Sequence, residues 1–141
     1  MSLHLEDQLC FSLYRAARSV IRSYDPLLKE LGITYPQYLM LMILWDVKEP
    51  VTVDYMKDRL QPETGTYEGL LEGLQDAGLA TVEDGTITIT QKGIDLEPRA
   101  VCIPETILNE YRKSGVDLVE FRESLDIVRE AGDAAEMQYP N

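Results

Sequence analysis

The sequence predicts a mainly helical protein of the α+β class, built around a winged helix-turn-helix. Two short helical patterns, at residues 53–60 and 65–77, are separated by a turn. They are followed by two strand-like runs on either side of Asp84-Gly85. Helix, turn, helix and hairpin is the layout of a winged helix-turn-helix. Longer amphipathic patterns lie on both sides of this unit, and the 141 residues have the length of one domain.

The N-terminal part predicts one long amphipathic helix followed by a short one. Over residues 5–23, apolar side chains recur at spacings of three and four, the period of one helix face. They are Leu9, Leu13, Ala17, Val20 and Ile21. We expect Asp25-Pro26 to end this helix, because the residue before a proline is biased away from helical backbone angles. Residues 26–31 then predict one further turn of helix, which Gly32 ends.

Residues 35–47 predict a helix that is buried on nearly every side. Thr34 is a suitable N-cap residue, and Gln37 three positions later completes a capping box. Pro36 fits the first turn of such a helix. The stretch from Tyr38 to Trp45 is entirely apolar, and a helix that is apolar nearly all round belongs in the core.

Within the winged unit, the apolar positions predict which face of each element is buried. Thr64 is expected to cap the second helix and Gly78 to end it. The expected inner positions are Val53, Met56 and Leu60 in the first helix and Leu70, Leu71 and Leu74 in the second. Residues 79–83 and 86–90 predict two strands, the second of which alternates threonine with isoleucine. Asp84-Gly85 between them is a strong signal for a two-residue hairpin turn.

After the hairpin the sequence returns to helical patterns. Residues 94–113 predict one helical run, with a kink or break near Pro104. Ser114-Gly115 separates this run from a last amphipathic helix at 116–131. Its expected inward side chains are Leu118, Phe121, Leu125 and Val128. From Gly132 onward we find no pattern and expect a frayed tail.

The terminal helices are apolar along one side, yet the chain is too short for a second domain that could cover them. We therefore assign residues 1–141 to a single domain with 51–93 as the winged unit. Residues 1–48 and 94–141 are expected to be dimerisation helices of a two-fold homodimer. The alternative is that both terminal parts pack on their own winged unit.

Composition and motifs exclude several classes of protein. The formal net charge is −12 and the estimated pI is 4.4, which argues against a protein that coats nucleic acid or an anionic membrane. His4 is the single histidine, and the sequence has neither a zinc-ligand spacing nor a glycine-rich nucleotide loop. We therefore expect no metal, no cofactor and no enzymatic activity, with a thiol peroxidase using Cys10 as a weak alternative.

The sequence also predicts a location. It has no signal-peptide pattern, and its longest apolar stretch is too short to span a bilayer. We expect a cytoplasmic protein in which both cysteines, Cys10 and Cys102, are reduced.

Several blocks of the sequence resemble one known family. Residues 5–16 read Leu-Glu-Asp-Gln-Leu-Cys-Phe-Ser-Leu-Tyr-Arg-Ala, and 24–28 read Tyr-Asp-Pro-Leu-Leu. Residues 31–39 read Leu-Gly-Ile-Thr-Tyr-Pro-Gln-Tyr-Leu, and residues 103–108 and 113–115 continue the likeness. These blocks resemble the organic-hydroperoxide regulators (OhrR-like), a branch of the MarR family of transcriptional regulators. The resemblance implies a homodimer, a winged helix-turn-helix in each chain and no cofactor.

The resemblance also implies that Cys10 is a redox sensor of organic hydroperoxides. The matching cysteine of the family attacks the peroxide as a thiolate and becomes a sulfenic acid. By position, Tyr24 and Tyr35 would reach Cys10 from the other subunit, and Tyr14 would line the same pocket. Phenol hydroxyls stabilise a thiolate by hydrogen bonding. The same pocket could instead take a small phenolic ligand.

The cysteines also allow plainer interpretations. From the residue alone, a small buried apolar side chain is the better interpretation of Cys10. Cys102 lies earlier in the sequence than the second cysteine of the family, and we interpret it as a structural, buried thiol.

The DNA-reading part departs from the family pattern. The expected DNA-contacting residues are Thr64, Gly65, Thr66, Tyr67 and Glu68. Where basic or polar residues are expected, the sequence has Glu68, Gly69, Glu72 and Gly73, and carboxylates repel phosphates. The hairpin is short and has no arginine. Residues 51–98 contain three basic and ten acidic side chains, a net charge of −7.

Two functional hypotheses follow. In the first, the protein is a dimeric, peroxide-responsive transcriptional regulator that binds double-stranded operator DNA, with help from Arg15, Arg18 or Arg22. In the second, the sensing dimer has lost ordinary DNA binding and acts through a protein partner, as an anti-repressor or a heterodimer partner.

Overall fold

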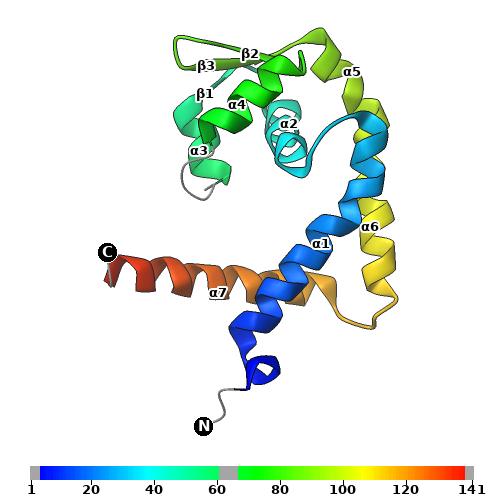
Figure 1. The fold of residues 1–141 in the computed structure, drawn as a ribbon, viewed down its shortest axis with the longest axis vertical. Coiled ribbons are helices and arrows are strands. Elements are labelled where there is room, and N and C mark those ends of the chain that lie inside the picture. Colours follow the sequence, from blue (N-terminus) through cyan, green and yellow to red (C-terminus); the bar gives the residue numbers. More distant parts are fainter. Residues whose placement is uncertain (1–3, 61–66, 139–141) are drawn as a thin grey trace. The chain divides into compact units, whose positions relative to one another are not determined.

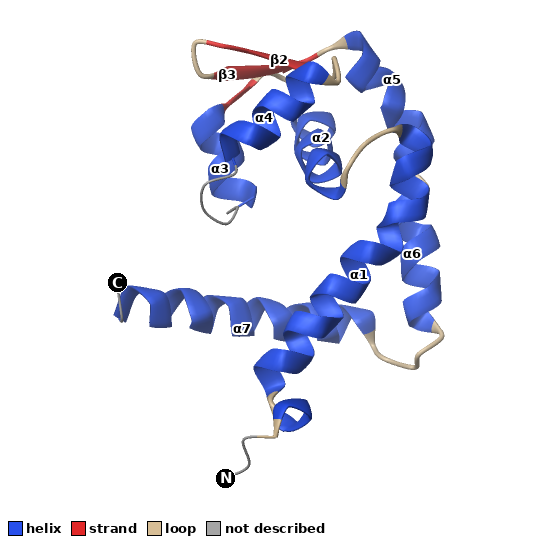
Figure 2. Ribbon diagram, viewed as in Figure 1, coloured by secondary structure: helices blue, strands red, loops and turns tan. Residues whose placement is uncertain are grey.

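The computed structural model describes residues 4–60 and 67–138 and is mainly helical, with one small sheet (Figures 1 and 2). The elements are η1 (Leu5–Asp7), α1 (Leu9–Leu31), α2 (Tyr35–Val47), β1 (Val51–Thr52), α3 (Val53–Leu60), α4 (Tyr67–Asp76), β2 (Ala80–Glu83), β3 (Thr86–Ile89), α5 (Gln91–Ala100), α6 (Ile103–Arg112) and α7 (Leu118–Gln138). The chain divides into two compact units, Met1–Ile103 and Pro104–Asn141. The fold class and the winged helix-turn-helix are confirmed.

The winged unit consists of α3, α4 and an antiparallel sheet with the strand order β1-β3-β2. The hairpin pairs Val82 with Ile87 and Glu83 with Thr86. Its turn residues, Asp84 and Gly85, both have positive φ angles, of 50° and 74°, as a two-residue turn of type I′ requires. The short strand β1 was not expected from the sequence, since two residues are too few to form a pattern.

Helix α1 is longer than expected, because it continues through Pro26 to Leu31. The prediction that Asp25-Pro26 ends the helix is therefore wrong. Proline removes one helical hydrogen bond, but continuation carries Leu28 into the core, where it is 1% exposed. Gly32, with a φ of 73°, then ends the helix, and its N–H bonds to the Leu28 and Lys29 carbonyls.

Helix α2 supplies much of the core of the first unit. Thr34 and Gln37 form the expected capping box, in which the Gln37 N–H donates to Thr34 Oγ1 (3.3 Å) and the Thr34 N–H donates to Gln37 Oε1 (2.9 Å). The buried residues of α2 are Tyr38, Met40, Leu41, Ile43 and Leu44. Burial of this nearly all-apolar helix confirms its place in the core.

Helix α5 packs closely against the sheet at Gly93. A Cβ atom at Gly93 would lie 2.5 Å from the Leu79 carbonyl oxygen and 2.7 Å from Ile89 Cγ1. The indole N–H of Trp45 donates to the Gly93 carbonyl (3.0 Å), which ties α2 to α5. The helix begins at Gln91, three residues earlier than expected, because Thr90 caps it instead of ending the strand.

The second unit contains α7 and nearly all of α6. Helix α7 extends to Gln138, so the prediction of a frayed tail from Gly132 is wrong. The alanines that follow Gly132 favour the helix and offset the cost of one glycine. None of the described side chains of α7 is buried. The expected inward residues Phe121, Leu125 and Val128 are 47%, 38% and 46% exposed in the single chain.

Two glycine substitutions test the packing of α5. We expect Gly93→Ala to lower the free energy of unfolding by about 2 kcal/mol, because the added methyl group meets a backbone carbonyl that cannot move aside. Gly69→Ala is the matched control, since Gly69 is also helical but has no neighbouring atom within 4 Å of the Cβ position. It should raise the free energy of unfolding by about 0.5–1 kcal/mol. Urea denaturation at equal protein concentration measures both, and an unchanged Gly93→Ala midpoint would contradict the close packing.

Candidate redox-sensing site and winged unit

Cys10 lies in the first turn of α1 and is exposed in the single chain. It is therefore not a core residue of its own subunit. Cys10 is the second residue of α1, and the first backbone N–H groups of a helix have no acceptor within the helix.

Three tyrosine rings meet where the C-terminal half of α1 packs against α2. The ring centres of Tyr24 and Tyr35 are 5.1 Å apart in an edge-to-face arrangement. Tyr38 is the third member, with its ring 5.8 Å from Tyr24 and 6.2 Å from Tyr35. The sequence interpretation missed Tyr38, although its position one helical turn after Tyr35 was a usable signal.

Two members of the tyrosine cluster (Tyr24, Tyr35 and Tyr38) have a raised pKa. Burial raises the pKa of Tyr35 above its ordinary value. Burial, followed by the neighbouring Tyr24 and Tyr35, raises the pKa of Tyr38 to about 12. At neutral pH such phenols are hydrogen-bond donors, which is the role the family resemblance implies for Tyr24 and Tyr35.

Cys10 and the tyrosine cluster lie far apart in one chain. Tyr24 lies fourteen positions after Cys10 on the same continuous helix, and a rise of 1.5 Å per residue makes their separation about 21 Å. A hydrogen bond between Cys10 and Tyr24 of the same subunit is therefore impossible while α1 is intact.

Tyr14, the fourth residue of the expected site, is exposed and pairs with an arginine. The guanidinium group of Arg18 donates to the Tyr14 hydroxyl (3.2 Å) and lies 5.4 Å from the centre of its ring. Arg15 and Arg22 line the same shallow depression on α1. Tyr14 therefore does not belong to the tyrosine cluster of its own subunit.

Cys102 lies at the junction of α5 and α6 and is exposed. The interpretation of this residue as a buried structural thiol is wrong for the single chain. The helical run breaks at Val101-Cys102, near Pro104 as expected, and the thiol lies at the surface of this break.

The exposed face of α4 is acidic. Glu68, Gly69 and Glu72 are exposed, as expected for the side of the helix that would face DNA. The expected contacts Thr64, Gly65 and Thr66 lie outside the described residues.

Tyr67 is 5% exposed, so its assignment as a DNA contact is wrong. It is the first described residue of α4, and its hydroxyl donates to the Val53 carbonyl at 3.5 Å. Burial raises the pKa of Tyr67 to about 12. The winged unit covers the large ring of Tyr67. The hydrogen bond of its hydroxyl to Val53 joins the start of α4 to the start of α3.

Within residues 4–60 and 67–138, no group of three or more histidine, cysteine, aspartate or glutamate side chains could hold a metal ion. No helix in these ranges is long and apolar enough to cross a membrane.

Comparison with known proteins identifies the relatives of the chain. The chain is 41% identical over 130 residues to the organic hydroperoxide resistance transcriptional regulator of Bacillus subtilis. This match covers 87% of this chain and 88% of that protein. The structure of the M. tuberculosis transcriptional regulator MosR matches with a TM-score of 0.80 and 26% identity, over 92% of this chain and 98% of that one. The structure of reduced AbfR of Staphylococcus epidermidis bound to DNA matches with a TM-score of 0.73 and 27% identity. This match covers 94% of this chain and 95% of that one. No family model matches the chain.

The chain has a winged helix-turn-helix flanked by long helices, and its relatives are transcriptional regulators. It is therefore a transcriptional regulator of the DNA-binding class and not an enzyme. The chain belongs to the MarR family, in the branch of the organic hydroperoxide resistance regulators. This confirms the family that the sequence blocks indicated.

Alkaline titration tests the tyrosine cluster. Since the pKa of Tyr38 is raised above 10.0, the usual value, the protonated phenol favours the folded state below pH 10. That contribution to stability should be lost as the pH rises from 10 to about 12. The absorbance of tyrosinate, followed as the pH is raised, measures this titration. We expect Tyr38→Phe to remove one group that titrates near pH 12, and Tyr67→Phe to remove another. A titration curve that Tyr38→Phe leaves unchanged would contradict the raised pKa.

Proposed function

We propose that the protein is a homodimeric regulator that senses an organic hydroperoxide through Cys10 and binds operator DNA according to the state of that residue. The observation that carries this proposal is the separation of Cys10 from the tyrosine cluster along α1, about 21 Å. Only a second subunit can bring Tyr24 and Tyr35 to Cys10, which is the arrangement that the family resemblance implies.

Exposed apolar side chains support the dimer. On α1 and the residues before it, Leu5, Leu9 and Ile21 are 54%, 69% and 41% exposed. On α7 the exposed apolar residues are Val119, Phe121, Leu125, Ile127, Val128 and Met137. Apolar surface of this extent is costly in water and typical of a homodimer interface. The two helices therefore suit a two-fold interface between copies of this chain.

The proposed sensing step is a two-electron oxidation of the Cys10 sulfur. The thiolate attacks the outer oxygen of a hydroperoxide R–O–OH, and the O–O bond breaks. The sulfur becomes a sulfenic acid, and the peroxide is reduced to the alcohol ROH after it takes up a proton. Phenol hydroxyls of the partner's tyrosine cluster would stabilise the thiolate before attack.

Oxidation would change the hydrogen bonds that the sulfur makes across the interface. A sulfenic acid has a smaller negative charge and a different shape from the thiolate, so the phenol donors have to rearrange. If the dimer interface can pack in two alternative ways, such a local change would favour one of them and alter the spacing of the two winged units. The related AbfR, whose reduced form is bound to DNA in its structure, supports DNA as the partner.

Cysteine variants test the sensing role. Cys10→Ser should bind DNA but lose all response to an organic hydroperoxide such as cumene hydroperoxide, because no thiol remains for the attack. Cys102→Ser is the matched control and should respond like the unaltered protein. DNA binding by fluorescence anisotropy, with and without peroxide, measures both. Loss of the response in Cys102→Ser but not in Cys10→Ser would overturn the assignment.

Mixed dimers test the cross-subunit geometry. A dimer of Tyr24→Phe/Tyr35→Phe subunits should oxidise slowly, because its Cys10 thiols lack phenol donors. In a first mixed dimer, one such subunit pairs with a Cys10→Ser subunit. Its remaining Cys10 then faces the intact tyrosines of the Cys10→Ser subunit, so the rate should be normal. In a second mixed dimer, one subunit carries all three changes and the other is unaltered, so the remaining Cys10 faces phenylalanines and should oxidise slowly. Equal rates in the two mixed dimers would contradict the cross-subunit contact.

The acidic face of α4 leads to a prediction about DNA affinity. Glu68→Gln/Glu72→Gln removes two negative charges that face the phosphates, so DNA binding should tighten by about fivefold to tenfold at low salt. Glu49→Gln, an exposed glutamate before β1, is the control and should change affinity less than twofold, a rough bound for a screened charge. Affinity that is unchanged by the paired substitution would show that α4 does not approach DNA.

A further inference from the structure

The third ring of the tyrosine cluster, Tyr38, packs against both of the other two. The centre of its ring lies 5.8 Å from that of Tyr24 and 6.2 Å from that of Tyr35. Both separations fall in the range of about 4.5–7 Å in which aromatic rings attract one another. Since the Tyr24 and Tyr35 rings are themselves 5.1 Å apart, the three rings form a closed triangle.

Tyr38 differs from the other two members of the cluster in its burial. It is 3% exposed, whereas Tyr24 and Tyr35 are partly exposed in the single chain. A ring that is almost completely covered by its own subunit cannot reach a sulfur atom of another subunit. Tyr38 is therefore the inner ring of the triangle, and the two outer rings rest against it.

The two outer rings belong to different helices. Tyr24 is in the C-terminal half of α1, and Tyr35 is the first residue of α2. A tyrosine ring is free to turn about its side-chain bonds unless its neighbours select one rotamer. Two hydroxyls can meet one sulfur atom only if both rings are held in matching orientations. Tyr38 contacts both rings and so couples their orientations.

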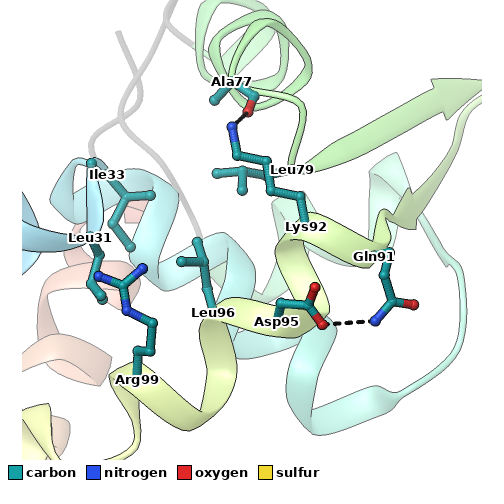
Figure 3. Close-up of a pocket in the computed structure, with 10 residues that line it drawn as sticks. Leu31, Ile33, Ala77, Leu79, Gln91, Lys92, Asp95, Leu96 and Arg99 are labelled. Atoms are coloured by element: carbon teal, nitrogen blue, oxygen red, sulfur yellow. Dashed lines mark hydrogen bonds between the residues drawn. The ribbon is translucent and has the colours of Figure 1, made fainter.

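The helices that carry the outer rings are held by contacts other than those of Tyr38. The capping box fixes the first turn of α2. At the end of α1, the Glu30 carbonyl accepts from the Arg99 guanidinium of α5 (3.4 Å). Leu31 of α1 and Leu96 of α5 line one cavity between these helices (Figure 3). Removal of the Tyr38 ring should therefore release the outer rings more than the helices themselves.

Tyr38 brings no charge to the cluster. Burial, followed by the neighbouring Tyr24 and Tyr35, raises the pKa of Tyr38 to about 12. Its hydroxyl is therefore protonated at neutral pH. An effect of Tyr38 on the outer rings has to come from the packing of its ring and not from an ionised oxygen.

We propose that Tyr38 is a positioning residue of the sensor, whose ring holds Tyr24 and Tyr35 so that both hydroxyls point to Cys10 of the partner subunit. This role rests on the proposed sensing function, which it deepens. Tyr38 touches neither the peroxide nor the sulfur and acts only through its two neighbours. Loss of its ring should slow the oxidation of Cys10 in the other subunit and leave Cys10 of its own subunit unaffected.

Mixed dimers in a Cys102→Ser background test this direction. In the first, a Tyr38→Leu subunit pairs with a Cys10→Ser subunit, so the remaining Cys10 faces an intact cluster and should react at the normal rate. In the second, one subunit carries both Tyr38→Leu and Cys10→Ser, and the other retains both residues. The remaining Cys10 then faces the altered cluster and should react with cumene hydroperoxide about threefold to tenfold more slowly. Trapping of the sulfenic acid with dimedone, followed by mass spectrometry, measures both rates.

Two further substitutions separate the ring of Tyr38 from its hydroxyl and from general stability. Tyr38→Phe keeps the ring, so in the second arrangement it should change the rate by less than about twofold. Ile43→Ala removes buried atoms of the same helix outside the cluster, so it should lower stability but leave the rate unchanged. Circular dichroism checks that each variant is folded. If Tyr38→Leu is unfolded, Tyr38→Met, which fills more of the same space, takes its place.

The possible results distinguish the role of Tyr38 from the sensing function. If the two Tyr38 mixed dimers react equally fast, or if Tyr38→Phe is as slow as Tyr38→Leu, the positioning role of the ring is overturned. The sensing function survives either result, because the Tyr24→Phe/Tyr35→Phe dimers test it separately. A Cys10 that fails to react with the peroxide in the unaltered protein would overturn both.

Discussion

The close approach of α5 to the sheet at Gly93 is the constraint on which the rest of the first unit depends. Because no side chain separates the helix from the Leu79 carbonyl, α5 lies near enough for Thr90 and Lys92 to bond the chain after α4. The Gly93 carbonyl then accepts from the Trp45 indole and joins the buried helix α2 to the same framework. The end of α4 is therefore held by the start of α5, and the wing also contributes, since the Val82 N–H of β2 donates to Gln75 of α4 (3.3 Å).

Features that depend on a few neighbouring residues were predictable from the sequence. The Thr34–Gln37 capping box and the Asp84-Gly85 turn each formed as expected, because the atoms involved lie within one turn of chain. Features decided by distant packing were not. Proline at position 26 predicts a helix end, but the burial of Leu28 favours continuation. Tyr67 is in a helix predicted to read DNA, yet its ring fills space beside α3, which no local pattern indicates.

The candidate sensing site was predictable only through the family resemblance. Cys10 alone is a small apolar residue, and its exposure follows from how little of α1 is covered within one chain: Leu28 is its one buried residue. Tyr24 and Tyr35 matched the family by position, but their contact with Tyr38 required knowledge of how the end of α1 packs against α2. Because α1 holds Cys10 and Tyr24 about 21 Å apart, the proposed site needs residues of two subunits.

The acidic charge of the winged unit has a consequence for the proposed switch. Non-specific DNA affinity comes largely from cations that displace counterions, and the exposed Glu68 and Glu72 oppose that term. In the proposed homodimer, affinity for an operator then has to come from contacts that both winged units make together, at one spacing set by the interface. If oxidation changes that spacing as proposed, little electrostatic attraction remains to hold the displaced dimer on DNA. We infer that an acidic reading surface makes release more complete at the cost of weaker binding, which suits a regulator that has to leave DNA after one chemical event.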